Sequence, residues 1–121
     1  MTRCLVADDC GFQRRYAKSI LVKIWGETEF HEATNVKTAL CQLQKVNLDL
    51  ALLDDDMGDG TSLEAIPSLI GTSCNRLPPL IMVSGNLDPT LPNRALQVGF
   101  SGFISKDELS LRTLREVLGS I

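Results

Sequence analysis

The sequence has no long hydrophobic run. No uninterrupted stretch of apolar residues exceeds about four positions, whereas a helix that crosses a bilayer needs about 20. The N-terminal residues lead directly into an apolar, strand-like segment and lack the charged, apolar and small-residue regions of a secretory signal. We therefore expect no membrane span, no membrane partner and a cytoplasmic protein.

The sequence also has no excess of positive charge. Twelve Lys and Arg residues stand against fifteen Asp and Glu residues, which gives a net charge of −3, and the basic residues are scattered along the chain. Nucleic-acid binding requires concentrated positive charge. Direct binding to nucleic acid is therefore not expected.

Cysteine and histidine residues are too few and too scattered for a zinc site. His31 is the only histidine, and the four cysteines show no C-x-x-C spacing; they are Cys4, Cys10, Cys41 and Cys74. We expect free thiols, and we expect His31 to follow the second strand as a structural or surface residue.

What is present is the composition of one globular domain. The chain has 121 residues, of which 44% are hydrophobic and 22% charged, and it contains neither a linker-like segment nor a repeat. We expect a single domain over residues 1–121. Five short apolar segments are predicted to be strands: Arg3–Ala7, Glu29–Glu32, Leu48–Leu53, Leu80–Val83 and Gly102–Ile104.

Helical patterns separate these segments. Three sets of apolar residues recur at helical spacing and predict three amphipathic helices. They are Phe12, Tyr16, Ile20 and Ile24; Val36, Leu40 and Leu43; and, at the end of the chain, Leu111, Leu114 and Leu118. A helix around Leu63, Ile66 and Ile70 requires Pro67 in its first turn, and a short helix is expected near Asn93–Val98. Alternating strands and helices predict a doubly wound α/β sandwich around a parallel sheet, whose ligands bind at the carboxyl ends of the strands.

Polar residues follow four of the predicted strands. They are the pair Asp8 and Asp9, then Asp54, Ser84 and Lys106. If the three carboxylates converge, they repel one another and should recruit a hard divalent ion, Mg²⁺ or Mn²⁺. The ion, the lysine and the hydroxyl would form a pocket for a phosphoryl group, with Asp54 as nucleophile, as metal ligand or as both.

The chain resembles the response-regulator receiver domains of two-component signalling over essentially its whole length. The residues that match are Asp8 and Asp9, Asp54 at the end of LALLD, Ser84 at the end of LIMVS, Phe103 in GFISK, and Lys106. The resemblance implies a five-stranded parallel sheet, doubly wound and flavodoxin-like, with strand order 2-1-3-4-5.

The resemblance also implies a mechanism. Asp54 would accept a phosphoryl group from a histidine kinase or a histidine phosphotransfer protein. Asp9, Asp54 and the backbone carbonyl of Asp56 would bind Mg²⁺ or Mn²⁺, with Asp8 acting largely through water. Lys106 and Ser84 would hold phosphoryl oxygens. Ser84 and Phe103 would then change position and alter the face that binds a downstream target protein or output domain.

Several positions depart from the family pattern. Asp55 replaces an apolar residue, Gly58 replaces a proline and Asp107 replaces the proline after the lysine. We expect Gly58 to loosen the loop after Asp54. We also expect Asp55, Asp56 and Asp59 to form an acidic rim around the site.

Two other functions fit parts of the pattern. Asp54 and Asp56 after an apolar strand resemble the D-x-D motif of haloacid-dehalogenase-like phosphatases, but those enzymes need a further acidic pair after the lysine. A receiver-like domain that serves only as a binding module is the second alternative.

Our prediction is a phosphoacceptor that assists its own phosphotransfer and dephosphorylation and is not an enzyme.

Overall fold

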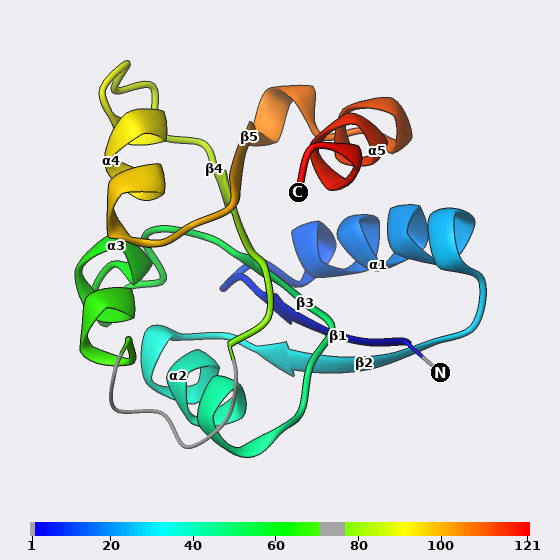
Figure 1. Ribbon diagram of the computed structural model, residues 1–121, viewed down its shortest axis with the longest axis horizontal. Coiled ribbons are helices and arrows are strands. Elements are labelled where there is room, and N and C mark those ends of the chain that lie inside the picture. Colours follow the sequence, from blue (N-terminus) through cyan, green and yellow to red (C-terminus); the bar gives the residue numbers. More distant parts are fainter. Residues whose placement is uncertain (1, 71–76) are drawn as a thin grey trace.

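The computed structural model describes residues 2–70 and 77–121. Strands and helices alternate along the chain (Figure 1). The strands are β1 (Thr2–Ala7), β2 (Thr28–Ala33), β3 (Leu50–Leu53), β4 (Leu80–Ser84) and β5 (Gly102–Ser105). The α-helices are α1 (Gly11–Trp25), α2 (Val36–Lys45), α3 (Ser62–Ala65), α4 (Leu91–Val98) and α5 (Leu111–Gly119), with 3₁₀ turns at Ile66–Ser68 and Lys106–Glu108.

The five strands form one parallel sheet in the order β2-β1-β3-β4-β5. The predicted fold class and strand order are therefore confirmed. The chain moves outward from β1 to β2 and then returns to place β3 on the other side of β1. The carboxyl ends of β1 and β3 flank this reversal, which is where doubly wound sheets bind ligands.

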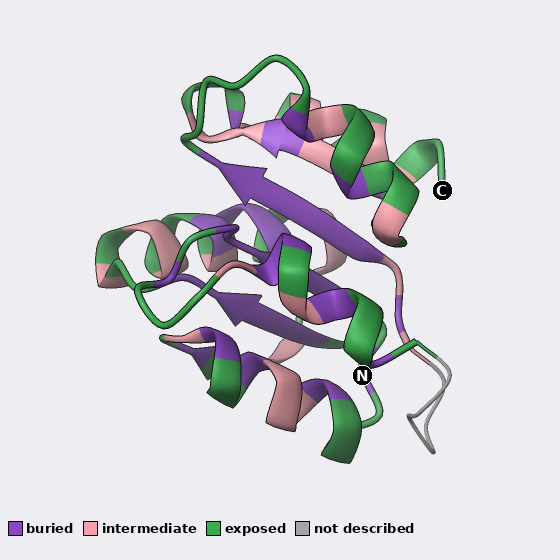
Figure 2. Cartoon of the chain, turned by 90° about the vertical axis from the view of Figure 1, so that its left-hand side faces the viewer, coloured by how far each residue is buried: buried purple, intermediate pink, exposed green. Residues whose placement is uncertain are grey.

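The two faces of the sheet support separate cores. Alternate strand residues such as Leu53 and Met82 join the core under α2, α3 and α4, whereas their neighbours Leu52 and Ile81 join the core under α1 and α5. Figure 1 shows α1 and α5 together on one side of the sheet. Every residue of β3 and β4 is buried, so these central strands are covered on both faces (Figure 2).

The predicted apolar stripe of α1 is wrong at its N-terminal end. Phe12 is 65% exposed and Tyr16 is 40% exposed, and the buried positions are Ala17, Ile20 and Leu21. Residues four apart drift around a helix of 3.6 residues per turn, so a stripe with a strict four-residue repeat leaves the core. Tyr16 instead donates its hydroxyl hydrogen to the Leu109 carbonyl at 2.8 Å.

The prediction for Pro67 is also wrong. The α-helix covers only Ser62–Ala65, and Pro67 lies in the 3₁₀ turn that follows it. Proline lacks the N–H group that would continue the helical ladder, so the α-helix ends before it. Leu63 and Ile66 are buried as expected, but Ile70 is exposed.

Three smaller expectations can also be compared with the structure. His31 lies within β2 and not after it. Cys4, Cys10 and Cys41 are free thiols, and Cys74 lies outside the described residues. None of the helices in residues 2–70 and 77–121 has the length and hydrophobicity needed to span a bilayer.

Candidate functional site

The carboxyl ends of β1 and β3 bring Asp8 and Asp54 together. These strands pair with Ala7 opposite Leu53, and the Asp54 N–H donates to the Ala7 carbonyl at 2.9 Å. Asp8 and Asp54 are buried, and Asp9 lies exposed beside them. One carboxylate oxygen from each of the three lies within 4.8 Å of the others. The structure thus brings together the three carboxylates that the strand ends indicate.

Lys106 reaches this cluster from the other half of the sheet. Ser84 of β4 lies opposite Ser105 of β5, so Lys106 leaves the sheet next to the end of β4. Its Nζ atom lies 3.0 Å from Oδ2 of Asp8 and 3.1 Å from Oδ2 of Asp54. One ammonium group therefore bridges two buried carboxylates.

The cluster holds more negative charge than Lys106 neutralises. Burial raises the pKa of Asp54 to about 6; the hydrogen bond from Lys106 opposes this rise, and the charge of Asp8 adds to it. Burial lowers the pKa of Lys106, but its hydrogen bonds to Asp8 and Asp54 outweigh burial and leave that pKa raised. Three carboxylates, two of them buried, against one ammonium fit a divalent cation with oxygen ligands.

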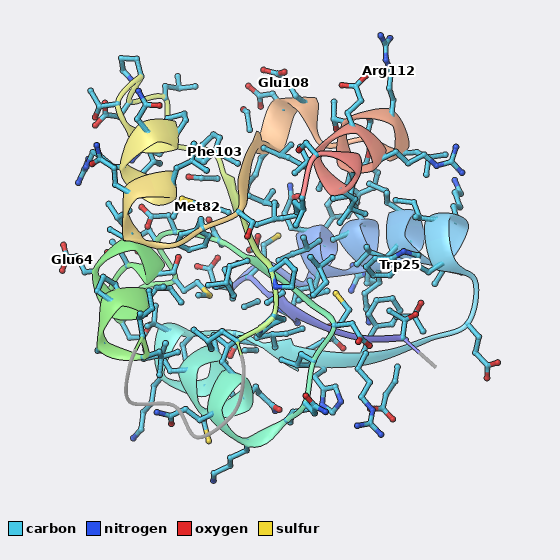
Figure 3. All side chains as sticks on the ribbon, in the orientation of Figure 1. Trp25, Glu64, Met82, Phe103, Glu108 and Arg112 are labelled. Carbon is cyan, nitrogen blue, oxygen red and sulfur yellow. The ribbon has the colours of Figure 1, made fainter. Side chains whose placement is uncertain are left out.

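Ser84 and Phe103 lie on the strands that lead to Lys106, Ser84 at the end of β4 and Phe103 within β5. Ser84 is buried at the end of β4, where its Oγ accepts a hydrogen bond from the Asn86 N–H at 3.1 Å. Phe103 pairs with Met82 and is half-buried on the side of β5 that faces α4 (Figure 3). It lines an open groove of about 360 Å³ between α4 and α5, together with Pro92, Glu108 and Glu116 among others.

Comparison with known proteins identifies the family. Residues 4–118 match the family described as response regulator receiver domain. The chain belongs to this family. It is 33% identical over 109 residues to a protein-glutamate methylesterase/protein-glutamine glutaminase from Alkalilimnicola ehrlichii, an alignment that covers 86% of this chain and 26% of that protein.

Two further comparisons define how far the likeness extends. A protein-glutamate methylesterase/protein-glutamine glutaminase from Rhodospirillum rubrum is 32% identical over 130 residues, which covers 100% of this chain and 34% of that protein. The receiver domain thus spans about a quarter to a third of the length of these relatives. The solved structure of the chemotaxis response regulator CheY4 of Vibrio cholerae superposes with a TM-score of 0.80 at 24% identity and covers 98% of this chain and 97% of that one.

The family match argues against the phosphatase alternative. In the receiver domain the acidic pair, Asp8 and Asp9, follows β1. Beyond Lys106 the acidic residues are Asp107, Glu108 and Glu116; the first two share an exposed 3₁₀ turn, and Glu116 pairs with Arg112 on α5. These positions do not supply the second acidic pair that a haloacid-dehalogenase-like site needs.

Asp55 contradicts the expectation of an acidic rim. Its side chain is buried and not on the rim, and its Oδ1 accepts a hydrogen bond from the Leu63 N–H at 3.1 Å. Its backbone carbonyl accepts from the Ser62 N–H at 2.8 Å. The Asp55 carboxylate, which stands where the family has an apolar residue, therefore gives a hydrogen-bond acceptor to an N–H group in the first turn of α3. Such N–H groups have no partner within the helix.

Asp59, which is exposed, and Gly58 each have a backbone contact or conformation that the sequence did not indicate. The Asp59 carboxylate accepts hydrogen bonds from the Val36 and Lys37 N–H groups at the start of α2, which lowers its pKa. Gly58 has a φ of +93°, a conformation that proline cannot adopt. The loop after Asp54 therefore makes a turn that proline could not form, and it is tied down at several points; the expected loosening by Gly58 stays a prediction. Asp56 lies exposed in it.

Sequence reasoning missed Arg14 on α1. Its Nη1 donates to the backbone carbonyl of Asp8 at 2.8 Å, and its Nε donates to Glu32 at 3.0 Å. The Cys10 N–H donates to Oδ1 of Asp8 at 2.9 Å. Arg14 thus fixes the backbone at the acidic pair. The sequence does place a basic residue in the helix that starts soon after Asp8 and Asp9. This feature alone could not identify Arg14, because many basic residues at such positions only face solvent.

Proposed function

We propose that this receiver domain accepts a phosphoryl group on Asp54 in an Mg²⁺-dependent reaction and acts as a cytoplasmic signalling switch. The observation that supports this best is the bridge from Lys106 to Asp8 and Asp54 inside a cluster of three carboxylates. The donor would be the phosphohistidine of a histidine kinase or of a histidine phosphotransfer protein. A bond forms between phosphorus and a carboxylate oxygen of Asp54 as the phosphorus–nitrogen bond breaks, and the histidine leaves.

The carboxylate cluster also supports a role for the metal ion. Asp9, Asp54 and the backbone carbonyl of Asp56 would hold Mg²⁺, or Mn²⁺ in its place, and Asp8 would act largely through water. The bound ion would supply positive charge that neutralises phosphoryl oxygens. The protein's own contribution is to keep the Asp54 carboxylate buried, ionised above its pKa of about 6, and paired with a fixed cation.

Lys106 and Ser84 support the handling of the phosphoryl group itself. Lys106 presents three N–H donors, and its Nζ already lies within hydrogen-bond distance of the acceptor carboxylate. Ser84 presents a hydroxyl at the end of the neighbouring strand. Phosphoryl transfer requires positioning and charge neutralisation more than covalent help from the protein, and Lys106 and Ser84 fit that role beside the metal ion.

The output of the switch would be a change at the groove lined by Phe103. Added charge on Asp54 would draw Ser84 toward the phosphoryl group and allow Phe103 to turn inward. The partner would be a downstream target protein or an output domain. In this proposal the receiver domain has no substrate that it turns over repeatedly, and so it is not an enzyme.

Labelling with acetyl phosphate and Mg²⁺ tests the acceptor. Intact-mass measurement should show one phosphoryl group per wild-type chain, lost slowly, and none on Asp54→Asn. Asp107→Asn is the matched control, because it removes the same charge from an exposed position beside Lys106; it should be labelled like the wild type. Equal labelling of Asp54→Asn would refute the assignment, and repeated turnover of a phosphomonoester would favour a phosphatase.

Beryllofluoride with Mg²⁺ tests the switch separately. It mimics the phosphoryl group and should shift NMR signals at Ser84 and Phe103. A labelled protein whose spectrum does not respond would be a phosphoacceptor without switching. A protein that is neither labelled nor perturbed would be the binding module that forms the second alternative.

A further inference from the structure

The loop between β3 and α3, residues 54–61, carries two of the proposed ion ligands. These are the Asp54 carboxylate and the backbone carbonyl of Asp56. The tip of the loop is built from Gly58 and Gly60, whose φ values are +93° and +142°. Glycine has the greatest backbone freedom of any residue, so a tip of this composition needs contacts outside itself to hold one conformation.

Bonds within the loop define its path. The Met57 N–H donates to the Gly60 carbonyl at 3.3 Å, and the Gly58 N–H donates to Oδ1 of Asp56 at 3.0 Å. Asp56 and Thr61 form an isolated antiparallel bridge. These bonds fold the tip back on itself but do not attach it to the rest of the molecule.

Asp59 attaches the tip to α2. Its Oδ1 lies 2.8 Å from the Val36 nitrogen and its Oδ2 lies 3.1 Å from the Lys37 nitrogen. The next N–H group of the helix, that of Thr38, donates to the side chain of Asn35 at 2.8 Å. Asp59 therefore uses both carboxylate oxygens to satisfy the first two N–H groups of α2, which have no partner within the helix.

The base of the same loop is held by a different helix. The Ser62 hydroxyl donates to the Asp54 carbonyl at 2.7 Å, and the Leu63 N–H donates to the Asp55 carboxylate. These contacts fix Asp54 and Asp55 against α3. Asp56 lies between this anchored base and Met57, whose side chain is buried in the core and whose N–H, in the same peptide as the Asp56 carbonyl, bonds to Gly60. Asp59 adds the attachment that fixes where the tip, and this peptide with it, lies relative to α2.

We propose that Asp59 is a positioning residue for the metal ion: by joining the tip of the loop to the first turn of α2, it holds the Asp56 carbonyl where an ion bound by Asp9 and Asp54 can use it. This inference rests on the proposed function. It is not a property of the fold alone, because α2 and the loop could each keep their shape while the loop, and the Asp56 carbonyl with it, lay differently relative to Asp9. Groups that orient metal ligands typically change metal affinity by 10-fold to 100-fold when they are replaced.

Two variants test the contact from its two sides. Asp59→Asn removes the charge and one acceptor. Val36→Pro removes one N–H donor and leaves every carboxylate in place; proline is accepted at the first position of a helix, and Asn35 before it has the extended φ of −149° and ψ of 170° that proline requires. Asp88→Asn is the matched control, since Asp88 is also exposed and accepts from a backbone N–H, that of Thr90, in another loop.

The measurement is the Kd for Mg²⁺, from the NMR shifts of the Asp9 and Lys106 amides in the full chain. We expect Asp59→Asn to weaken binding about tenfold, Val36→Pro to weaken it by a smaller factor, and Asp88→Asn to change it by less than about twofold. At saturating Mg²⁺ the labelling rate with acetyl phosphate should return to the wild-type value in both test variants. A role in stability alone would lower the free energy of unfolding in urea and leave the Kd unchanged.

Two results would overturn the proposal. One is a Kd within about twofold of wild type in both Asp59→Asn and Val36→Pro; the other is equal weakening by Asp88→Asn, which would reveal only an effect of net charge. If Val36→Pro, which also removes a buried side chain, does not fold, Asp59→Asn decides. A wild-type chain that shows no Mg²⁺-dependent shift at Asp9 and no labelling would instead refute the proposed function.

Discussion

Lys106 and Asp54 are separated by 52 positions in the chain, and the Nζ of Lys106 donates a hydrogen bond to Oδ2 of Asp54 at 3.1 Å. The order of strands in the sheet explains this contact. β3 and β5 each pair with β4, so the residues that follow them leave the same edge of the sheet. Asp8 joins them because β1 is the other neighbour of β3. The topology alone therefore brings together a cation, an acceptor and further acidic groups.

Replacing Lys106 by alanine should separate metal binding from the response to a phosphoryl group. The Kd for Mg²⁺ should not rise, because Lys106 contacts the same carboxylates as the ion would. Affinity for beryllofluoride in the presence of Mg²⁺ should fall by about tenfold or more, since a hydrogen bond to a charged group contributes about 1.5–3 kcal/mol. NMR titration measures both. Lys45→Ala, at an exposed position on α2, is the control, and a normal beryllofluoride response in Lys106→Ala would contradict this role.

The raised pKa of Asp54 predicts an unusual pH dependence of stability. Its pKa rises from 3.8 to about 6 on folding, so the folded state binds a proton that the unfolded state has released between these values. Without a metal ion, the free energy of unfolding should therefore fall as pH rises through this window and stay lower above pH 6. The shift corresponds to an upper bound of roughly 3 kcal/mol.

Asp54→Asn should remove this destabilisation. In EDTA the variant should be more stable than the wild type at pH 7.5 by up to about 3 kcal/mol, and the difference should shrink toward pH 4. Its amide oxygen can still accept a hydrogen bond from Lys106. Urea unfolding at several pH values measures the difference. Asp49→Asn, at an exposed position before β3 and so at the opposite end of that strand from Asp54, should show no such pattern. A constant difference between wild type and Asp54→Asn across pH would be evidence against the raised pKa.

Site residues could be predicted from the sequence where a local pattern marks the end of a strand and the sheet topology brings that end to the site. The strand ends at Asp8, Asp54 and Ser84 could be predicted because short apolar runs stop at polar residues, and parallel pairing then brings those residues to one edge. Asp59 could not be assigned in this way, because its partners in α2 lie 22 and 23 positions earlier and no local pattern links them. The buried position of Asp55 was equally hidden, since its partner N–H belongs to a helix of only four residues.

Gly58 gives a prediction that depends only on the backbone. Its φ of +93° lies outside the range of proline, and no atom beyond its two chain neighbours lies within 4 Å of where a β-carbon would be. Gly58→Ala should therefore cost about 1 kcal/mol through strain alone, and Gly58→Pro, the residue usual in the family, should cost more. Gly119→Ala, where the space is also open but φ is not positive, is the control in urea unfolding. A Gly58→Pro variant as stable as the wild type would show that the loop has a second, more usual conformation.

Gly102 is required for a different reason, the close approach of α5 to β5. A β-carbon on Gly102 would lie 2.5 Å from Cγ1 of Val117, which is too close for any real contact. Gly102→Ala should therefore displace α5 and lower the free energy of unfolding by about 1–3 kcal/mol.

Removing the opposing methyl groups should relieve the overlap. The double variant Gly102→Ala, Val117→Ala should be less destabilised than the sum of the two single variants, because the atoms that collide in the first are absent in the second. Additive effects on the free energy of unfolding would mean that α5 moves away from the added methyl group without any loss of stability.

Since Gly102 precedes Phe103 and Val117 lines the same groove as Phe103, Gly102→Ala should also shift the NMR signals of Phe103 in the unphosphorylated protein. The double variant should return them toward their wild-type positions, which would show that the packing of α5 on β5 sets the resting position of the aromatic ring.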